Sequence, residues 1–246
     1  MNSARYTTVH SPAPERPGSR ADAVYHGLYE ELLQGQHPYG VRLAEGRIAD
    51  RFGVSRTPAR EALLRLEAEG HLIRHDDGGL SPNPPQISQM RDRYELRSIL
   101  ELAMVRRTAG AHSGTPSVAL TELRTDWQRL AADPALTEAT ADPGFVHIDE
   151  DFHVRLAQAA GNAAVVAALR DVNDRIRLLR VHDFLRPGRI AATIREHVDV
   201  LDAVVAGDAD RAAALLQAHI DLSASVVEQR VGTVLSRPFE RPGSTR

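Results

Sequence analysis

The stretch RIADRFGVSRTPAREALLRLEAEG, residues 47–70, decides how the first part of this chain folds. Its apolar residues recur at helical spacing on both sides of a Gly-Val-Ser turn. Gly53 favours the positive φ angle that ends a helix, and Ser55 is a preferred N-cap for the next one. Pro58 falls in the first turn of that second helix, where its missing N–H needs no partner. The stretch therefore predicts two short helices joined by a tight turn.

The amino end of the second predicted helix carries side chains suited to contact DNA. Arg56 and Arg60 are four residues apart, so they share one face. In a helix-turn-helix this end enters the major groove, where an arginine can donate two hydrogen bonds to guanine. Residues 71–80 predict a short strand, a glycine turn and a return strand, which form a wing. A solvated helical pair with ordinary surface arginines is the alternative, and the combined turn, cap, proline and wing signals disfavour it.

The composition is that of a globular protein long enough for two domains, with 246 residues, 42% of them hydrophobic and 26% charged. The chain has no cysteine, which excludes disulfides and thiolate metal sites. The polar amino-terminal segment has no apolar stretch, so it is expected to be a disordered tail and the protein to be cytoplasmic. A net charge of −3 does not exclude DNA, because residues 47–65 hold five arginines and two acids.

We predict a mainly α chain: an N-terminal winged helix-turn-helix and a C-terminal all-helical, six-helix bundle. The predicted segments are a tail (1–19), the winged domain (20–82), a proline-rich linker (83–86), the helical domain (87–230) and a second tail (231–246). The six helical stretches are expected near residues 87–111, 116–132, 144–160, 162–186, 188–206 and 208–230.

Four potential metal ligands occur in the helical part. Asp149 and His153 are four residues apart in one predicted helix, so both lie on one face. His197 and His219 lie on two later predicted helices within apolar patterns. Three imidazoles and one carboxylate suit Zn²⁺, Ni²⁺, Mn²⁺ or Fe²⁺, and bundles build such sites from facing helices. Each histidine alone could instead be a hydrogen-bonded core or surface residue. His147 is expected on the opposite face.

The first domain resembles the winged-helix domain of GntR-family transcriptional regulators over residues 20–82. The resemblance is carried by Arg42-Leu43-Ala44-Glu45, by Gly-Val-Ser-Arg-Thr-Pro-Ala-Arg-Glu-Ala-Leu from Gly53, and by Leu-Glu-Ala-Glu-Gly ending at Gly70. It implies a set of DNA-binding residues: Arg47, Arg51, Ser55, Arg56, Thr57, Arg60, Gly78 and Gly79.

In that set, the two arginines of the second helix would contact bases or phosphates. The two hydroxyl side chains beside them would hold the DNA backbone, and the glycine pair would bring the tip of the wing to the minor groove. Gly46 stands where some relatives carry an arginine that touches DNA. Arg47 or Arg51 is therefore expected to supply that contact here.

The second half resembles the FCD ligand-binding domain of the FadR subfamily over residues 87–230. The matching motifs are Glu95-Leu96-Arg97 with Leu100-Glu101, Asp149-Glu150-Asp151-Phe152-His153, Ala159-Ala160-Gly161-Asn162, and Glu196-His197 with Gly207-Asp208 and His219. The resemblance implies a divalent metal on Asp149, His153, His197 and His219, with zinc first and nickel, manganese or iron as alternatives.

An octahedral ion on these four ligands would keep positions open for a small carboxylate effector. Arg97 could clamp the same carboxylate, although a salt bridge within its acid-rich helix is the other interpretation. Arg175 and Arg177 are weaker candidates for this role. Asn162 is expected to be a helix cap or turn residue.

Together these features predict a transcriptional regulator, taken to be a repressor, that binds palindromic double-stranded operator DNA as a homodimer. A small carboxylate at the metal site would change its affinity for DNA. No catalytic residue and no membrane partner are expected. One alternative is a metal-dependent hydrolase or lyase, in which Glu150, Asp151 or Glu196 beside the ligands would act as a base. Another is a regulator whose metal is purely structural.

Overall fold

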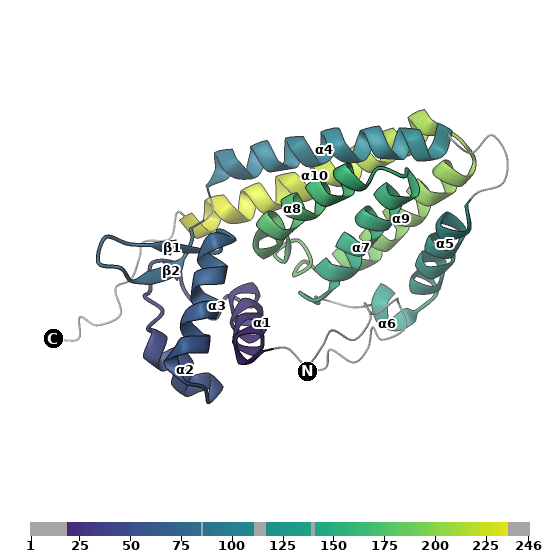
Figure 1. The fold of residues 1–246 in the computed structure, drawn as a ribbon. Helices are drawn as coiled ribbons and strands as arrows, with labels where there is room; N and C mark the ends of the chain where they lie inside the picture. The colour runs from purple at the N-terminus through teal and green to yellow at the C-terminus, as the bar shows by residue number, and fades with distance from the viewer. Residues whose placement is uncertain (1–18, 85, 111–116, 139–140, 236–246) are drawn as a thin grey trace.

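The computed structural model describes residues 19–84, 86–110, 117–138 and 141–235 (Figure 1). Within these ranges the chain forms a winged helix-turn-helix followed by an all-helical bundle, which confirms the predicted fold class. No helix in the described ranges is long and apolar enough to cross a membrane. The two expected tails fall mostly outside the described residues.

The winged domain contains α1 (Arg20–Leu33), α2 (Glu45–Phe52), α3 (Arg56–Ala68), β1 (Leu72–Arg74) and β2 (Leu80–Pro82). Ser19 forms a capping box with Asp22 at the start of α1. Gly53 ends α2 with a φ of 63°, as the sequence predicted. Ser55 occupies the N-cap position of α3, but its hydroxyl makes no capping hydrogen bond.

The wing is an antiparallel pair in which Leu72 faces Pro82. Its turn is held by Arg74, which donates to Glu67 of α3 and to the carbonyl of Gly78. Ser81 and Pro82 are both buried and complete β2, directly before the proline-rich linker. A proline is tolerated here because Pro82 is the last residue of β2 and lies beyond the bridge that Leu80 makes with Leu43.

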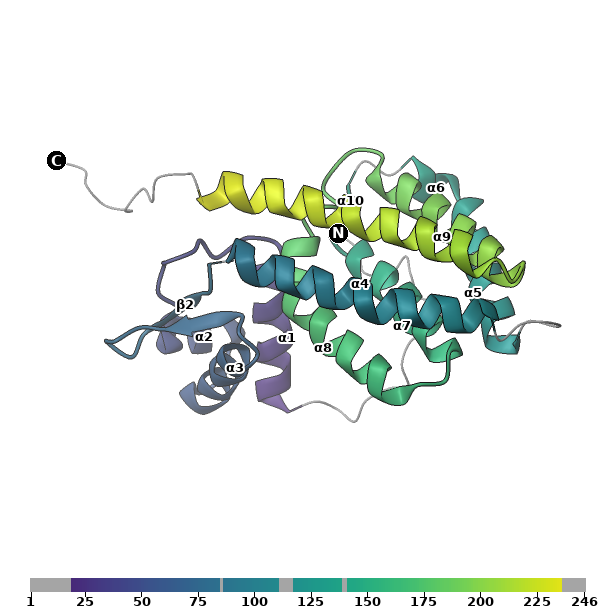
Figure 2. The same cartoon turned by 90° about the horizontal axis from the view of Figure 1, so that it is seen from above.

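The bundle contains α4 (Ile87–Gly110), α5 (Val118–Ala131), α6 (Pro134–Thr137), α7 (Phe145–Ala159), α8 (Ala163–Arg180), α9 (Arg189–Val205) and α10 (Ala209–Leu235). The long helices α4 and α10 run side by side in both views (Figures 1 and 2). Beneath this pair, α7 packs on α8, and α9 packs on α10 and α5. The metal-ligand candidates lie on α7, α9 and α10, which meet inside the bundle.

The helices differ from the sequence prediction in three respects, two of them helix ends and one an additional helix. First, α8 ends at Arg180, six residues before the expected end at 186. The chain must turn before Pro187, and Phe184 of this turn packs on Phe145 with ring centroids 5.2 Å apart. Second, α10 continues to Leu235, so residues 231–235 are helical and not part of a tail. Third, the one-turn helix α6 is too short to give a periodic signal. Asn162 caps α8 as expected.

Candidate functional site

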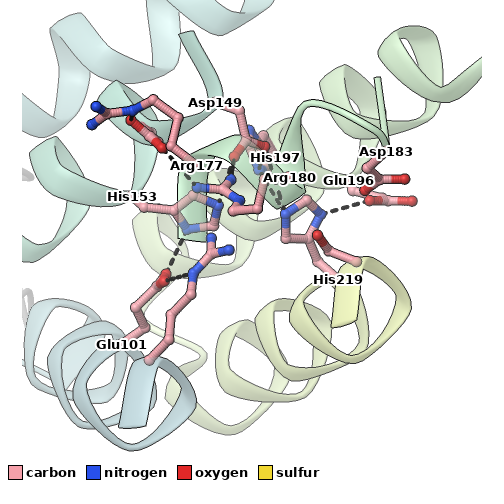
Figure 3. Close-up of polar contacts among 12 residues, drawn as sticks. Glu101, Asp149, His153, Arg177, Arg180, Asp183, Glu196, His197 and His219 are labelled. Carbon is pink, nitrogen blue, oxygen red and sulfur yellow. Dashed lines mark hydrogen bonds and ion pairs between the residues drawn. The ribbon is translucent and has the colours of Figure 1, made fainter. Parts of the chain in front are cut away.

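Asp149, His153, His197 and His219 converge in the interior of the bundle (Figure 3). Each offers one potential ligand atom, and these four atoms lie within 4.8 Å of one another. Nε2 of His197 is 3.5 Å and Nε2 of His219 is 3.8 Å from Oδ1 of Asp149. Nε2 of His153 is 3.6 Å from Oδ2 of the same carboxylate. All four side chains are buried, none with more than 3% of its surface exposed. The structure therefore brings together the four residues that the sequence grouped.

Carboxylates behind the imidazoles determine which nitrogen faces the centre. Nδ1 of His153 is 2.5 Å from Glu101, and Nδ1 of His219 is 2.6 Å from Glu196. A carboxylate accepts a proton donor, so each Nδ1 carries the hydrogen and each Nε2 keeps its lone pair. His197 is instead fixed by packing, because its ring stacks on Phe152 with centroids 3.6 Å apart. The three Nε2 atoms are thus held in place before any ligand arrives.

The charges at this centre follow from burial and pairing. Burial lowers the pKa of His153 to about 4 even though Glu101 opposes the shift. Burial and the neighbouring His219 also lower the pKa of His197. Burial would raise the pKa of Glu101, but His153 and Arg97 outweigh it and hold the value at about 2. Neutral imidazoles beside ionised carboxylates are the protonation states that metal binding requires.

The donor set fits a divalent cation. Oδ1 of Asp149 and Nε2 of His153 are buried polar atoms without a hydrogen-bond partner among the described residues. Such atoms are rare in proteins unless a ligand satisfies them. Nε2 of His197 and Nε2 of His219 are 3.3 Å apart, as two ligands of one ion can be. His147 stays outside this group, with Nε2 3.9 Å from Glu30 and nearly half of its side chain exposed.

Arg97 is fully buried beside the centre. Its Nε donates to Glu101 at 2.6 Å, so the salt-bridge interpretation holds for this nitrogen. Nη1 and Nη2 have no partner among the described residues. A buried guanidinium with two free nitrogens has the geometry to receive a carboxylate in a bidentate manner. Thr193, one turn before His197 on α9, is buried with an unpartnered hydroxyl as well.

Arg180 is the principal residue of the site that the sequence did not single out. It is 1% exposed, and its Nη2 donates to Oδ2 of Asp149 (Figure 3). Its Nη1 lies 3.3 Å from Glu150. Arg180 holds the pKa of Asp149 well below its ordinary value, although burial acts in the opposite direction. The available signal was that Arg180 follows Leu169, Val172 and Ile176 at helical spacing, so that a charged residue ends an apolar helical face.

Arg177 and Arg175 do not belong to the centre. Nε of Arg177 donates to Glu150 at 2.7 Å, and its Nη1 donates to Tyr29 at 3.1 Å. Arg175 pairs with Asp171 on the surface of α8. Neither side chain faces the four donor atoms.

The start of α3 presents the side chains expected to contact DNA. Ser55, Arg56, Thr57 and Arg60 are all exposed. A Cβ on Gly46 would lie 3.8 Å from Nη2 of Arg56, so this guanidinium covers the beginning of α2.

Arg47 or Arg51 was expected to supply the DNA contact that some relatives make with an arginine at the position of Gly46. The surroundings of these two arginines differ. Arg51 is engaged with Glu31 at 2.9 Å and with Gln36 at 3.2 Å. Arg47 is exposed and has no ion pair among the described residues. Arg47 is therefore the freer of the two.

The wing adds one arginine that sequence reasoning did not assign to the interface. Nη2 of Arg42 is 3.1 Å from Asp77, and its side chain lies against Gly79. Gly78 adopts a φ of 79°, which only glycine tolerates easily. Arg42 therefore lies next to the predicted wing tip, with its charge shared with Asp77.

Comparison with known proteins agrees with this division of the chain. Residues 20–81 match the family model described as bacterial regulatory proteins, gntR family, and residues 92–222 match the FCD domain. The Nta operon transcriptional regulator of Aminobacter aminovorans is 28% identical over 211 residues, covering 84% of this chain and 96% of that protein. The transcriptional repressor RspR of Escherichia coli is 26% identical over 211 residues, covering 84% and 89%.

Solved structures show the same fold. The E. coli protein McbR/YncC superposes with a TM-score of 0.65 at 20% identity, covering 87% of this chain and 99% of the other. The matched families and relatives are transcriptional regulators, which separates this chain from the metal-dependent hydrolases and lyases. The chain belongs to the GntR family of bacterial transcriptional regulators and joins its DNA-binding domain to an FCD domain.

Proposed function

We propose that this DNA-binding regulator senses a small carboxylate through a divalent metal, with zinc as the first candidate. The observation that carries the proposal is the buried set of four donors, Asp149, His153, His197 and His219, in which Oδ1 of Asp149 and Nε2 of His153 have no hydrogen-bond partner among the described residues. Zinc, nickel, manganese and iron all accept imidazole and carboxylate ligands. A divalent ion bound here would supply positive charge and open coordination positions for an anion.

Arg97 is the residue that we propose binds the effector together with the metal. Its Nε is fixed by Glu101, and the same carboxylate holds His153, so Arg97 and one metal ligand are positioned by a single residue. Two free buried nitrogens on Arg97 favour an anion with two oxygens at one end. The effector class is therefore a small carboxylic acid.

On the DNA side, we propose that the chain acts in the cytoplasm as a homodimer on a palindromic operator. The contacts would come from the start of α3, from Arg47 and Arg51 on α2, and from Gly78 and Gly79 in the wing. A two-fold dimer places two such domains on two half-sites. The relative RspR is named a repressor, which supports repression as the mode of regulation here.

The experiment is thermal unfolding of the full chain against a panel of small carboxylic acids, with Zn²⁺ bound and again after chelation. A ligand that binds the native state raises its stability by RT ln(1 + [L]/Kd). We expect one acid to raise the Tm of the zinc-loaded protein only. His219→Ala should abolish the response through the metal and Arg97→Met through the effector. Arg175→Met, on the exposed face of α8, should leave it intact.

A regulator with a purely structural metal is the second candidate. The sensor and this candidate both predict a zinc-dependent Tm. It is distinguished by the acid panel: stabilisation by zinc with no response to any acid would favour the structural metal. No binding of Zn²⁺, Ni²⁺, Mn²⁺ or Fe²⁺ by the wild-type protein would refute both candidates.

A further inference from the structure

A row of charged side chains leads from the candidate metal centre to the winged domain. Oδ2 of Asp149 accepts from Nη2 of Arg180, whose Nη1 lies 3.3 Å from Oε1 of Glu150. The other oxygen of Glu150 accepts from Nε of Arg177 at 2.7 Å. Nη1 of Arg177 then donates to the hydroxyl of Tyr29 on α1 at 3.1 Å. Figure 3 shows Asp149, Arg177 and Arg180 of this row.

Most of the row is shielded from water. Asp149, Glu150, Arg180 and Tyr29 are buried, and the Arg177 side chain is 18% exposed. Charges in such surroundings interact more strongly than at the surface, because water does not screen them. A change in one pair is therefore felt by the next pair.

Two carboxylates share one guanidinium at the start of the row. When Asp149 shares its charge with a bound cation, its attraction for Arg180 becomes weaker. Nη1 of Arg180 already lies beside Glu150, so the ion pair between Arg180 and Glu150 becomes stronger. Glu150 then holds Arg177 less tightly, and Arg177 is the residue that contacts Tyr29.

Tyr29 is connected to the DNA-reading helix. Its ring stacks on Tyr25 with centroids 5.9 Å apart and meets His71 edge-on at 5.0 Å. The Arg65 guanidinium of α3 lies 3.8 Å from the Tyr25 ring centroid. The Tyr25 hydroxyl also donates to Glu69, the C-cap of α3, at 2.5 Å. Movement of Tyr29 would therefore reach the end of α3.

We propose that Arg177 couples the metal centre to the winged domain through its bridge between Glu150 and Tyr29. This inference rests on the proposed function, because the metal centre is taken as the sensor. Occupancy of the centre changes how firmly Arg177 holds α1, and α1 packs directly on α3. The bridge gives the sensor a physical route to the DNA-contacting helix, and removal of one hydroxyl would break it.

The test is hydrogen–deuterium exchange of the full chain, stripped with chelator and then loaded with Zn²⁺. Tyr29→Phe removes the hydroxyl that accepts from Arg177 and keeps the ring stacked on Tyr25. Tyr25→Phe is the matched control for exchange in α1, because its hydroxyl bonds Glu69 at the end of α3 and has no contact with Arg177 among the described hydrogen bonds. We expect zinc to change exchange in α1 of the wild type and of Tyr25→Phe. In Tyr29→Phe the change should stay within the bundle, with unaltered zinc affinity.

A second measurement separates this proposal from the proposed function. Affinity is measured for a DNA duplex selected from a random pool by the wild-type protein. Allosteric coupling typically changes affinity by about 5- to 150-fold. We expect zinc to change the affinity of the wild type for the duplex by a factor in this range. In Tyr29→Phe the ratio of the affinities with and without zinc should approach one. A zinc response of α1 that survives in Tyr29→Phe, or is absent from the zinc-bound wild type, overturns the role of Arg177. A response of α1 without any change in duplex affinity supports the bridge and refutes zinc-linked regulation.

Discussion

Replacing Arg180 by methionine tests how the buried charge of Asp149 is balanced. Arg180 supplies the guanidinium that pairs with this carboxylate. The nearby imidazoles of His153 and His197 are kept neutral by burial, which lowers the pKa of both. Methionine fills much of the space of arginine without its charge. The variant Arg180→Met therefore leaves Asp149 in the interior without a cation.

The expected loss of stability is large. Removing one partner of a buried ion pair costs about 3–5 kcal/mol. For a protein of this length, 1 kcal/mol corresponds to about 2–4 °C in Tm, so the Tm of the metal-free variant should fall by roughly 6–20 °C. Zinc at about a hundred times its Kd adds about 2.7 kcal/mol to the native state. The gain should be larger in Arg180→Met, because no guanidinium competes with the ion for Asp149.

Calorimetric unfolding with Zn²⁺ and after chelation measures both effects. Arg175→Met is the control, because this arginine lies on the same helix and pairs with Asp171 at the surface. Loss of an exposed pair should change stability by less than about 1 kcal/mol. The reasoning is refuted if metal-free Arg180→Met is as stable as the control. It is also refuted if zinc stabilises the wild type and Arg180→Met equally.

Three other outcomes are expected. Arg56→Ala and Arg60→Ala should each weaken operator binding by about 1–3 kcal/mol in a titration, because a bidentate contact to guanine is lost. Glu101→Gln should lower zinc affinity by about 10- to 100-fold in a competition assay, because His153 loses the carboxylate that orients it. Stability of the metal-free protein should fall as pH drops from 6.5 to about 4, because the unfolded chain takes up the proton that the lowered pKa of His153 excludes from the native state.

Each of these outcomes has a control. Arg124→Ala, in an exposed pair with Asp202 on the bundle, should leave DNA affinity unchanged. Glu95→Gln, on the exposed face of α4, should leave zinc affinity unchanged. Equal affinity of both DNA variants and the wild type would remove α3 as the reading helix. Undiminished zinc affinity in Glu101→Gln would show that this carboxylate does not orient His153 for metal binding. Constant stability between pH 6.5 and about 4 would contradict the buried neutral state of His153.

The parts of the fold that could be predicted from the sequence are encoded locally. Gly53 and Pro58 mark the helix-turn-helix through backbone preferences that require no other part of the chain. The spacing of Asp149 and His153 places them on one face because the pitch of a helix is fixed. The histidines of α9 and α10 were grouped with them by their order in a known type of domain.

The unpredicted parts depend on contacts between distant segments. Arg180 meets Asp149 only because α8 packs on α7, and the helical spacing within α8 does not show this. Likewise, Glu101 reaches His153 across 52 positions of sequence. The end of α8 was predicted too late because the apolar pattern of the helix continues to Phe184. This residue packs in the core, but it lies in the turn after the helix.

The depth of the four donors has a consequence for kinetics. No donor is more than 3% exposed, and the ring of His197 packs against both Phe152 and Trp127, whose ring centroids are 3.6 and 4.4 Å away. An ion held here could leave only when helices of the bundle separate. Its exchange rate would then be set by the opening of the protein and not by the strength of a chelator in solution, so a bound ion would behave as a long-lived part of the folded chain.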